Sequence, residues 1–189
     1  MTLTPIAKPD FDVEIALAYA TADNVTGKPI YGRAEAQLHP HAAAALTRAI
    51  ALAAPLGLRF KIFDAYRPVA AQWVLWNSFP DPDFIADPRV GSKHSRGIAV
   101  DLTLVDAASG AELDMGTPFD DFRPLAHHGR TDLSVEVQRN RALLLGLMTA
   151  AGWDWYQFEW WHYQLFDPLS YPLLHDDAVP RPLMPASAA

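Results

Sequence analysis

The sequence predicts a single α+β domain in which helices flank a central antiparallel sheet. Its 189 residues suit one domain, and a composition of 50% hydrophobic and 20% charged residues is enough to bury a core. Segments typical of strands and of helices both occur, but they do not alternate strictly along the chain. We assign residues 1–189 to this one domain and expect a mobile tail from about residue 180.

Two helices and one strand are expected between residues 41 and 78. Residues 41–54 are rich in alanine and leucine and end before Gly57, which predicts a helix that is closed by a glycine. Residues 58–64, LRFKIFD, alternate well enough to predict a strand. Pro68 suits the first turn of a second helix that runs to about Ser78. The proline-rich segment FPDPDFIADP that follows predicts an irregular loop.

The second half predicts a strand, a long loop, a helix and an aromatic hairpin. Residues 98–105, IAVDLTLV, predict a strand with one apolar face, and Asp101 points away from that face. Residues 106–133 are expected to form a long loop, and loops of that length in a compact domain usually have a function. Ser134 begins a helix that Gly152 ends after Ala151. The aromatic-rich residues 153–166 predict a strand or a pair of hairpin strands.

The composition excludes several classes of function. A formal charge of −7 argues against broad electrostatic binding to nucleic acid or to an anionic membrane. The chain has no cysteine, which excludes disulfides, thiolate metal ligands and a cysteine nucleophile. The first twenty residues lack the pattern of a signal peptide, and no run of about eighteen apolar residues predicts a membrane span. We therefore expect a cytoplasmic protein, whose oligomeric state the sequence does not indicate.

Two short segments about sixty residues apart carry the residue types of a catalytic zinc site. They read SKHSRGIAVD (92–101) and EWWH (159–162). His94, Asp101 and His162 are the right chemical types for three protein ligands, and a catalytic zinc keeps a further position open for water. Glu159 is a spare carboxylate that can take a proton from that water. The pattern therefore makes hydrolysis the first hypothesis.

The first segment needs a turn before its strand. Asp101 lies inside an apolar strand, where a buried and unpaired carboxylate would be costly unless a metal ion or an arginine compensated it. His94 lies seven residues earlier, and an odd separation in an unbroken strand would place the two side chains on opposite faces. We therefore expect His94 to precede the strand, with a turn around Ser95 to Gly97 that brings it back.

The second segment also contains two candidate residues at an odd separation, which a regular strand would place on opposite faces. Glu159 and His162 are three residues apart, so both face one metal only if the backbone bulges at Trp160 or Trp161, or if Glu159 lies at the strand entrance. The two tryptophans are expected to be core residues, with at most one of them lining a pocket. The remaining histidines are expected to be loop, structural or solvated residues, namely His39, His41, His127, His128 and His175.

The motifs also resemble those of a known family. Together with DAYRP (64–68), LAYATADNVTGKPIYG (17–32) and GAELDMGTPFDDF (110–122), they resemble the VanX-type D-alanyl-D-alanine dipeptidases. These are zinc enzymes of the D-Ala-D-Ala peptidase group, which shares a fold with hedgehog signalling domains. The resemblance runs from about residue 12 to residue 168, and the last two segments point to the dipeptidase branch. The chain has Val25 where the family pattern has phenylalanine.

The resemblance implies a role for each of eight residues. His94, Asp101 and His162 match zinc ligands, with one Zn²⁺ per chain. Glu159 matches the catalytic base, and Arg67 matches the arginine that faces the scissile carbonyl oxygen. The residues that match substrate-binding groups are Ser92 and Asp120, which would hold the substrate's amino terminus, and Tyr19, which would line the site.

The implied activity is hydrolysis of the small dipeptide D-Ala-D-Ala to two D-alanines. The implied setting is either resistance to glycopeptide antibiotics or recovery of D-alanine from cell-wall turnover. Two alternatives stay open at this point. One is a carboxypeptidase of the same group that trims longer cell-wall peptides, against which Asp120 argues because it would favour a free ammonium. The other is a non-catalytic zinc-binding module, against which Glu159 argues.

Overall fold

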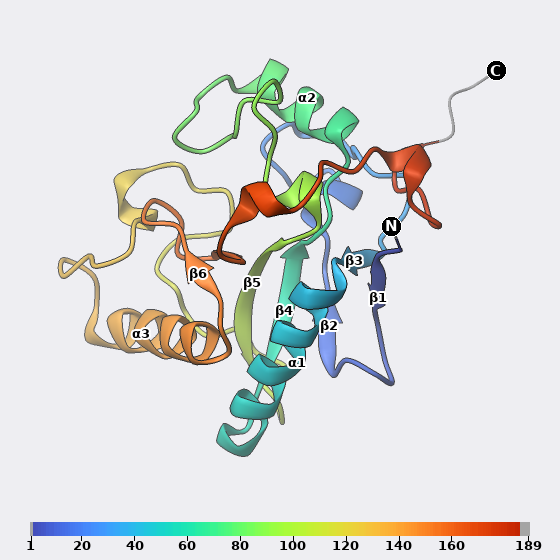
Figure 1. Ribbon diagram of the computed structural model, residues 1–189. Helices are drawn as coiled ribbons and strands as arrows, with labels where there is room; N and C mark the ends of the chain where they lie inside the picture. Colours follow the sequence, from blue (N-terminus) through green and yellow to red (C-terminus); the bar gives the residue numbers. More distant parts are fainter. Residues whose placement is uncertain (1, 186–189) are drawn as a thin grey trace.

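A five-stranded sheet forms the centre of the computed structural model, which describes residues 2–185 (Figure 1). Neighbouring strands are antiparallel except for the first pair, which is parallel. The α+β class is therefore confirmed. The sheet was expected to be antiparallel, but the parallel pair makes it mixed. In spatial order the strands are β2 (Val13–Ile15), β4 (Leu58–Asp64), β5 (Ala99–Asp106), β7 (His162–Gln164) and β6 (Asp154–Trp155).

A second, two-stranded sheet lies beside the first. β1 (Thr4–Ile6) pairs with β3 (Ala36–Leu38) in antiparallel register. Sequence reasoning predicted neither these strands nor β2. Each has three residues, and a segment of that length holds too few alternations between apolar and polar positions to predict a strand.

Three α-helices surround the central sheet at the expected places. α1 (Pro40–Ala53), α2 (Val69–Ser78) and α3 (Val135–Ala150) agree with the predicted ranges to within about one residue. The predicted start of α3 at Ser134 is confirmed: Ser134 is the N-cap, and its side chain accepts a hydrogen bond from the backbone N–H of Val137 at 3.2 Å. The 3₁₀ turns are η1 (Ala18–Ala20), η2 (Ala54–Leu56), η3 (His94–Arg96), η4 (Pro124–Ala126), η5 (Pro168–Ser170) and η6 (Asp176–Ala178).

Small side chains let α1 approach the sheet closely. The helix packs on β4 and also touches α3, which lies beside β6 (Figure 1). An alanine loses little side-chain entropy on burial and leaves room for a neighbouring backbone, so this face combines helix propensity with close packing. The buried residues of α1 are Ala42, Ala43, Ala45, Leu46, Ala49 and Ala53.

Arg141 of α3 holds the long loop that follows β5. Its side chain is only 6% exposed, and its Nε donates to the Met115 carbonyl at 2.8 Å. Its Nη1 donates to the carbonyls of Leu125 and His127 at 3.0 and 3.1 Å. One guanidinium therefore fixes both ends of the segment 115–127, which has little regular structure of its own beyond η4.

The C-terminal segment lies against the domain up to the last described residue. Leu183 is fully buried, and its carbonyl accepts a hydrogen bond from the N–H of Gly32 at 2.7 Å. The N–H groups of Leu183 and Met184 donate to the Asp176 carboxylate at 2.8 Å each. The rest of the predicted tail, residues 186–189, lies outside the described residues, and the mobility of this end stays a prediction.

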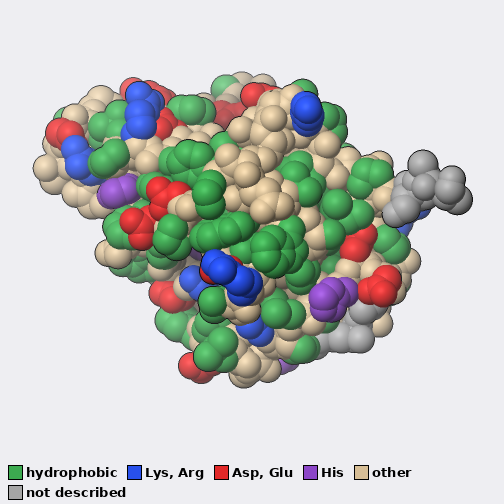
Figure 2. Space-filling view, turned by 90° about the horizontal axis from the view of Figure 1, so that it is seen from above, with side chains coloured by type: hydrophobic (Ala, Val, Ile, Leu, Met, Phe, Trp, Pro, Cys, Tyr) green, Lys and Arg blue, Asp and Glu red, His purple; other side chains and the backbone are tan. Residues whose placement is uncertain are grey.

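The surface seen from above mixes side chains of both charges. Acidic and basic groups are interspersed with apolar ones on this face, without a broad area of a single sign among the residues described (Figure 2). None of the helices within residues 2–185 has both the length and the apolar character needed to cross a membrane.

Replacing Arg141 by methionine is expected to lower the free energy of unfolding by about 2 to 3 kcal/mol. The substitution leaves the carbonyls of Met115, Leu125 and His127 without their donor, and a buried polar group that loses its partner costs roughly 1 to 3 kcal/mol. Urea denaturation measures the difference. The exposed Arg139 on the same helix is the control, and an Arg139→Met variant with the same loss would contradict the assigned role.

Candidate active site

The register of the central sheet places three polar residues in a row. Asp64, at the end of β4, is the cross-strand neighbour of Asp101 on β5, and Asp101 is the neighbour of His162 on β7. Side chains of directly paired residues lie on the same face of a sheet. Two residues proposed as metal ligands, 61 positions apart in the sequence, are therefore brought into contact by strand pairing alone.

His94 reaches the same place from a turn. It lies in η3, and Gly97 ends that turn with a φ of 69° before β5 begins at Ala99. A side chain at Gly97 would also approach the backbone nitrogen of His39 to 3.1 Å. Both the backbone angle and the crowding require glycine at this position. The expected turn between His94 and the strand is thus confirmed.

The three candidate ligands form a compact cluster of donor atoms. His94 Nε2 lies 3.2 Å from His162 Nδ1 and 3.3 Å from Asp101 Oδ2, and His162 Nδ1 lies 3.0 Å from Asp101 Oδ1. Metal–ligand distances of about 2.0–2.1 Å at tetrahedral angles place zinc donors roughly 3.3 Å apart. The separations therefore fit a single small cation.

Hydrogen bonds on the far side of each imidazole fix its tautomer. The Nδ1–H of His94 donates to the carbonyl of Ala65 at 2.7 Å, which leaves Nε2 as an acceptor. Gln164 Nε2 donates to the Asp154 carboxylate at 3.3 Å, so Gln164 Oε1 faces His162 Nε2 at 3.1 Å and accepts a hydrogen bond from its N–H. His162 Nδ1 is then an acceptor as well.

This arrangement leaves three acceptors facing one another. The facing nitrogens of His94 and His162 carry lone pairs, and the Asp101 carboxylate only accepts. Burial lowers the pKa of His162, which favours the neutral imidazole, although Asp101 opposes the shift. A cation would satisfy all three atoms at once, so the residues present fit a metal site.

Glu159 lies beside this cluster in the turn between β6 and β7. The strand begins only at His162, so Glu159 precedes it and the predicted irregularity is confirmed. Its carboxylate is buried, accepts no hydrogen bond within residues 2–185, and lies 3.7 Å from His162 Nδ1. Burial, with the nearby carboxylates of Asp101 and Asp120, raises the pKa of Glu159. The group is therefore suited to exchange a proton.

Arg67 is held rigidly beside the same cluster. Its Nε donates to Asp64 at 2.7 Å, its Nη1 donates to Gln72 at 3.0 Å, and its Nη2 lies 3.5 Å from Asp101. The guanidinium carbon also lies 4.9 Å from the centre of the Tyr19 ring. Since these contacts fix its plane, Arg67 presents its remaining N–H groups to the pocket in one orientation.

Asp120 lies at one side of the pocket in an unusual backbone conformation. Its φ of 59° lies in the left-handed region, which non-glycine residues enter at a cost. The Tyr19 hydroxyl donates to its two carboxylate oxygens at 3.2 and 3.0 Å. Burial raises the pKa of Asp120 to about 7, although Arg67 acts against the shift. A cationic partner in the pocket would favour its charged form.

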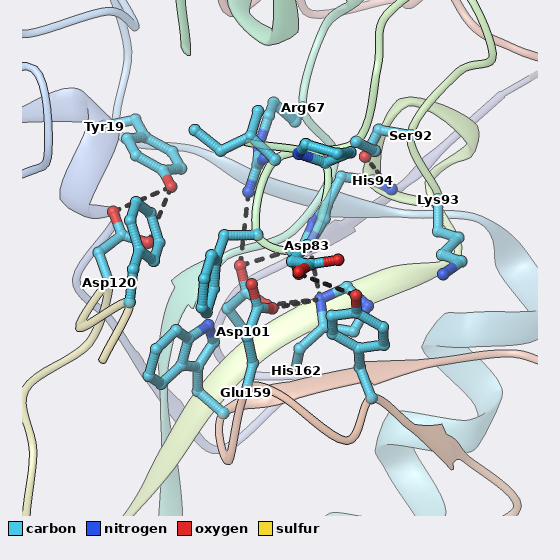
Figure 3. Close-up of a pocket in the computed structure, with 17 residues that line it drawn as sticks. Tyr19, Arg67, Asp83, Ser92, Lys93, His94, Asp101, Asp120, Glu159 and His162 are labelled. Atoms are coloured by element: carbon cyan, nitrogen blue, oxygen red, sulfur yellow. Dashed lines mark hydrogen bonds and ion pairs between the residues drawn. The ribbon is translucent and has the colours of Figure 1, made fainter. Parts of the chain in front are cut away.

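One pocket brings together all eight residues that the sequence predicted (Figure 3). It is small, with a volume of about 100 Å³. Ser92 lies in its wall, where its oxygen accepts the backbone N–H of His94 at 3.2 Å. The eight are Tyr19, Arg67, Ser92, His94, Asp101, Asp120, Glu159 and His162.

Sequence reasoning missed the residues that support the site. Gln164 was detectable, because a residue two positions after His162 in a strand shares its face. Asp64, which accepts from Arg67 and from the Tyr31 hydroxyl at 2.8 Å, had no such sign, because its role depends on cross-strand register. Lys93 lies within the motif of residues 92–101 and lines the pocket, but the pattern of the motif does not indicate a role for it.

Trp160, Trp161 and His39 lie as expected. Trp160 and Trp161 are both buried, and only Trp161 lines the pocket. His39 is the N-cap of α1, and its Nδ1 accepts from the N–H of His41 at 3.1 Å.

Comparison with known proteins identifies the family. The family model Peptidase M15, described as D-Ala-D-Ala dipeptidase, matches residues 2–180. The chain belongs to this family. Within it, the chain is 48% identical over 165 residues to the D-alanyl-D-alanine dipeptidase of Escherichia coli (strain K12), a match that covers 87% of this chain and 85% of the relative. The family resemblance drawn from the motifs is therefore confirmed.

A less similar D-Ala-D-Ala dipeptidase and one solved structure also match. The D-alanyl-D-alanine dipeptidase of Enterococcus faecium is 36% identical over 169 residues, which covers 79% of this chain and 84% of that protein. A crystal structure of a mutant of the vancomycin resistance D,D-pentapeptidase VanY, in complex with Zn(II), aligns with a TM-score of 0.46 and 14% identity. That alignment covers 88% of this chain and 85% of VanY.

Replacing Gln164 by leucine is expected to weaken metal binding by about 10- to 100-fold, the usual effect of losing a group that orients a metal-bound histidine. Without the acceptor Oε1, His162 is free to carry its proton on Nδ1, where it blocks the ligand position. Zinc affinity, measured by competition with a chromophoric chelator, tests this. The exposed Gln157 is the control, and equal affinities for the Gln164→Leu and Gln157→Leu variants would exclude the role.

Proposed function

We propose that this member of the D-Ala-D-Ala dipeptidase family hydrolyses D-Ala-D-Ala to two D-alanines with one zinc ion per chain. The observation that supports this most directly is the set of three buried acceptors beside a buried carboxylate that has no hydrogen-bond partner among the described residues. The names of the relatives support the substrate. In this proposal the substrate is a small free dipeptide, and the small pocket volume agrees with that choice.

The ion would be held by His94 Nε2, a carboxylate oxygen of Asp101 and His162 Nδ1. Two neutral imidazoles and one carboxylate are typical ligands of a catalytic zinc. When bound, zinc supplies Lewis-acid chemistry, which lowers the pKa of water and polarises a carbonyl oxygen. The backbone of Ala65 and the side chain of Gln164 hold the two imidazoles in the tautomers that this role requires.

Glu159 is the proposed base. Its carboxylate accepts a proton from the water that attacks the peptide carbonyl carbon, and it then donates that proton to the nitrogen of the leaving D-alanine. A base that must both take and return a proton works best when its pKa is near the working pH. Burial supplies a shift in that direction for Glu159, and a cation at the ligand cluster would offset part of it.

Arg67 is the proposed partner of the oxygen that becomes negative in the transition state. Its contacts with Asp64 and Gln72 hold the guanidinium before the reaction, so little reorganisation is needed when charge develops. Loss of one such donor typically slows an enzyme by about 100- to 1000-fold.

Asp120, with Tyr19, would bind the amino terminus of the dipeptide, whereas Ser92, for which the resemblance implied the same role, lies across the pocket beside Lys93 and His94. An ammonium that enters this side of the pocket meets the Asp120 carboxylate, whereas a neutral amide leaves that carboxylate without a cationic partner. This selectivity favours a dipeptidase over the alternative carboxypeptidase, which would act on longer peptides. The presence of Glu159 beside the ligand cluster favours an enzyme over a non-catalytic zinc-binding module.

Incubation of the zinc-loaded protein with D-Ala-D-Ala, followed by an assay of free D-alanine, tests the proposed function. Release of two D-alanines for each dipeptide is expected, and removal of the metal with a chelator should abolish it. A fully zinc-loaded protein that releases no D-alanine would refute the proposal.

The Glu159→Gln variant should retain zinc and lose activity by about 100- to 10,000-fold. Glutamine preserves the size of the side chain but cannot accept the proton, and general acid–base catalysis is typically worth that factor. Metal content and kcat are measured on the same preparation. The exposed Glu112 provides the control, Glu112→Gln, which should keep full activity. Full activity in zinc-loaded Glu159→Gln would remove the base assignment.

The wild type should prefer D-Ala-D-Ala over its N-acetylated form, and Asp120→Asn should reduce that preference by about 10- to 100-fold. The basis is the loss of a charge-assisted hydrogen bond, worth roughly 1.5 to 3 kcal/mol, to the free ammonium. The ratio of kcat/KM for the two substrates is the measurement, with the exposed Asp132→Asn as the control. Efficient cleavage of the N-acetylated form by the wild type would favour the carboxypeptidase alternative.

A further inference from the structure

Lys93 places a second positive charge in the pocket wall. It directly precedes His94 at the start of η3, and its side chain is half-buried. Its Nζ lies 5.3 Å from the centre of the Tyr156 ring, a geometry in which the ring face attracts the ammonium. The Tyr156 hydroxyl donates to the carbonyl of Asp83 at 2.8 Å, so the ring that supports Lys93 is itself fixed.

Within residues 2–185, Lys93 has no carboxylate within 4.0 Å. The other cation of the pocket, Arg67, is already paired with Asp64 and Asp101. A charged group that is partly removed from water without a counter-ion loses solvation that an aromatic ring restores only in part. Lys93 is therefore the cation of the pocket that remains available to an incoming anion.

The pocket has opposite charges at its two ends. Figure 3 shows Asp120 with Tyr19 at one end and Lys93 at the other, with His94, Asp101 and His162 between them. A free dipeptide has the same polarity, because it carries an ammonium at one end, a carboxylate at the other and its peptide bond between them. With its ammonium at Asp120, such a dipeptide would place its peptide bond over the ligand cluster and its carboxylate toward Lys93.

We propose that Lys93 binds the C-terminal carboxylate of the dipeptide substrate and makes the enzyme selective for a free carboxyl end. This inference rests on the proposed function and extends it from one end of the substrate to the other. A lysine ammonium is a compact charge that pairs with a carboxylate through a charge-assisted hydrogen bond. Together, Asp120 and Lys93 would select dipeptides, because a longer peptide cannot place both of its charged termini at the two ends of this pocket.

A different role for Lys93 would be to adjust the proton affinity of Glu159, which also faces it. The two roles predict different kinetics. A group that binds a distant part of the substrate changes KM with little effect on kcat, whereas a group that acts through the base changes kcat. The second role also affects every substrate equally, whether or not its C-terminus carries a charge.

The test compares D-Ala-D-Ala with D-Ala-D-Ala amide, which lacks the terminal negative charge. For Lys93→Met, KM for D-Ala-D-Ala should rise by about 10- to 100-fold with kcat changed by no more than about twofold, as expected for the loss of a charge-assisted hydrogen bond. The kinetics of the amide should barely change. Lys93→Arg should recover part of the loss, and the exposed Lys28→Met is the matched control.

Binding can also be measured without turnover. In a Glu159→Gln background, the affinity for D-Ala-D-Ala should fall by a similar factor when Lys93→Met is added, whereas the affinity for the amide should stay the same. Equal effects of Lys93→Met on the acid and the amide, or an effect on kcat alone, would overturn the inference and leave the proposed function intact. A zinc-loaded wild type that does not cleave D-Ala-D-Ala would overturn both.

Discussion

The buried cluster of negative and electron-rich groups on and beside the three middle strands of the sheet is the constraint that organises this protein. Asp64, Asp101 and Glu159 are all buried, and Arg67 pairs with the first two of them. Two imidazole nitrogens add further lone pairs. Such an arrangement is costly unless a cation compensates it, because buried charges lose the solvation that water provides. The divalent ion that we propose meets this requirement and supplies the chemistry as well.

The fold meets the geometric demands of this cluster with few elements. Strand register fixes the row from Asp64 to His162, and the turn closed by Gly97 delivers His94 from the side. The groups behind the ligands come from the same strands, since Gln164 follows His162 on β7. Two of the three groups that would hold a metal are thus on strands, whereas the groups that would contact the substrate lie on turns and loops around them.

The sequence predicted much of the site because strand geometry leaves few options. The odd spacing of His94 and Asp101 required a turn, and the spacing of Glu159 and His162 required a break in the strand, and both are present. Asp120 was different, since acids in loops are usually solvated, and only the family resemblance singled it out. The three-residue strands and the place of Asp64 depend on contacts between distant segments, which local patterns do not encode.

Arg141 anchors the loop 115–127 to α3, so this loop can change in sequence independently of the strands that carry the candidate metal ligands. The hydrolytic groups belong to strands and to the turns beside them, whereas Asp120 belongs to a segment fastened elsewhere, at its two ends. Proteins that share this fold could therefore change the residues between these two anchor points, and with them the substrate preference that we propose for Asp120. The groups on the strands, and the reaction proposed for them, would stay the same.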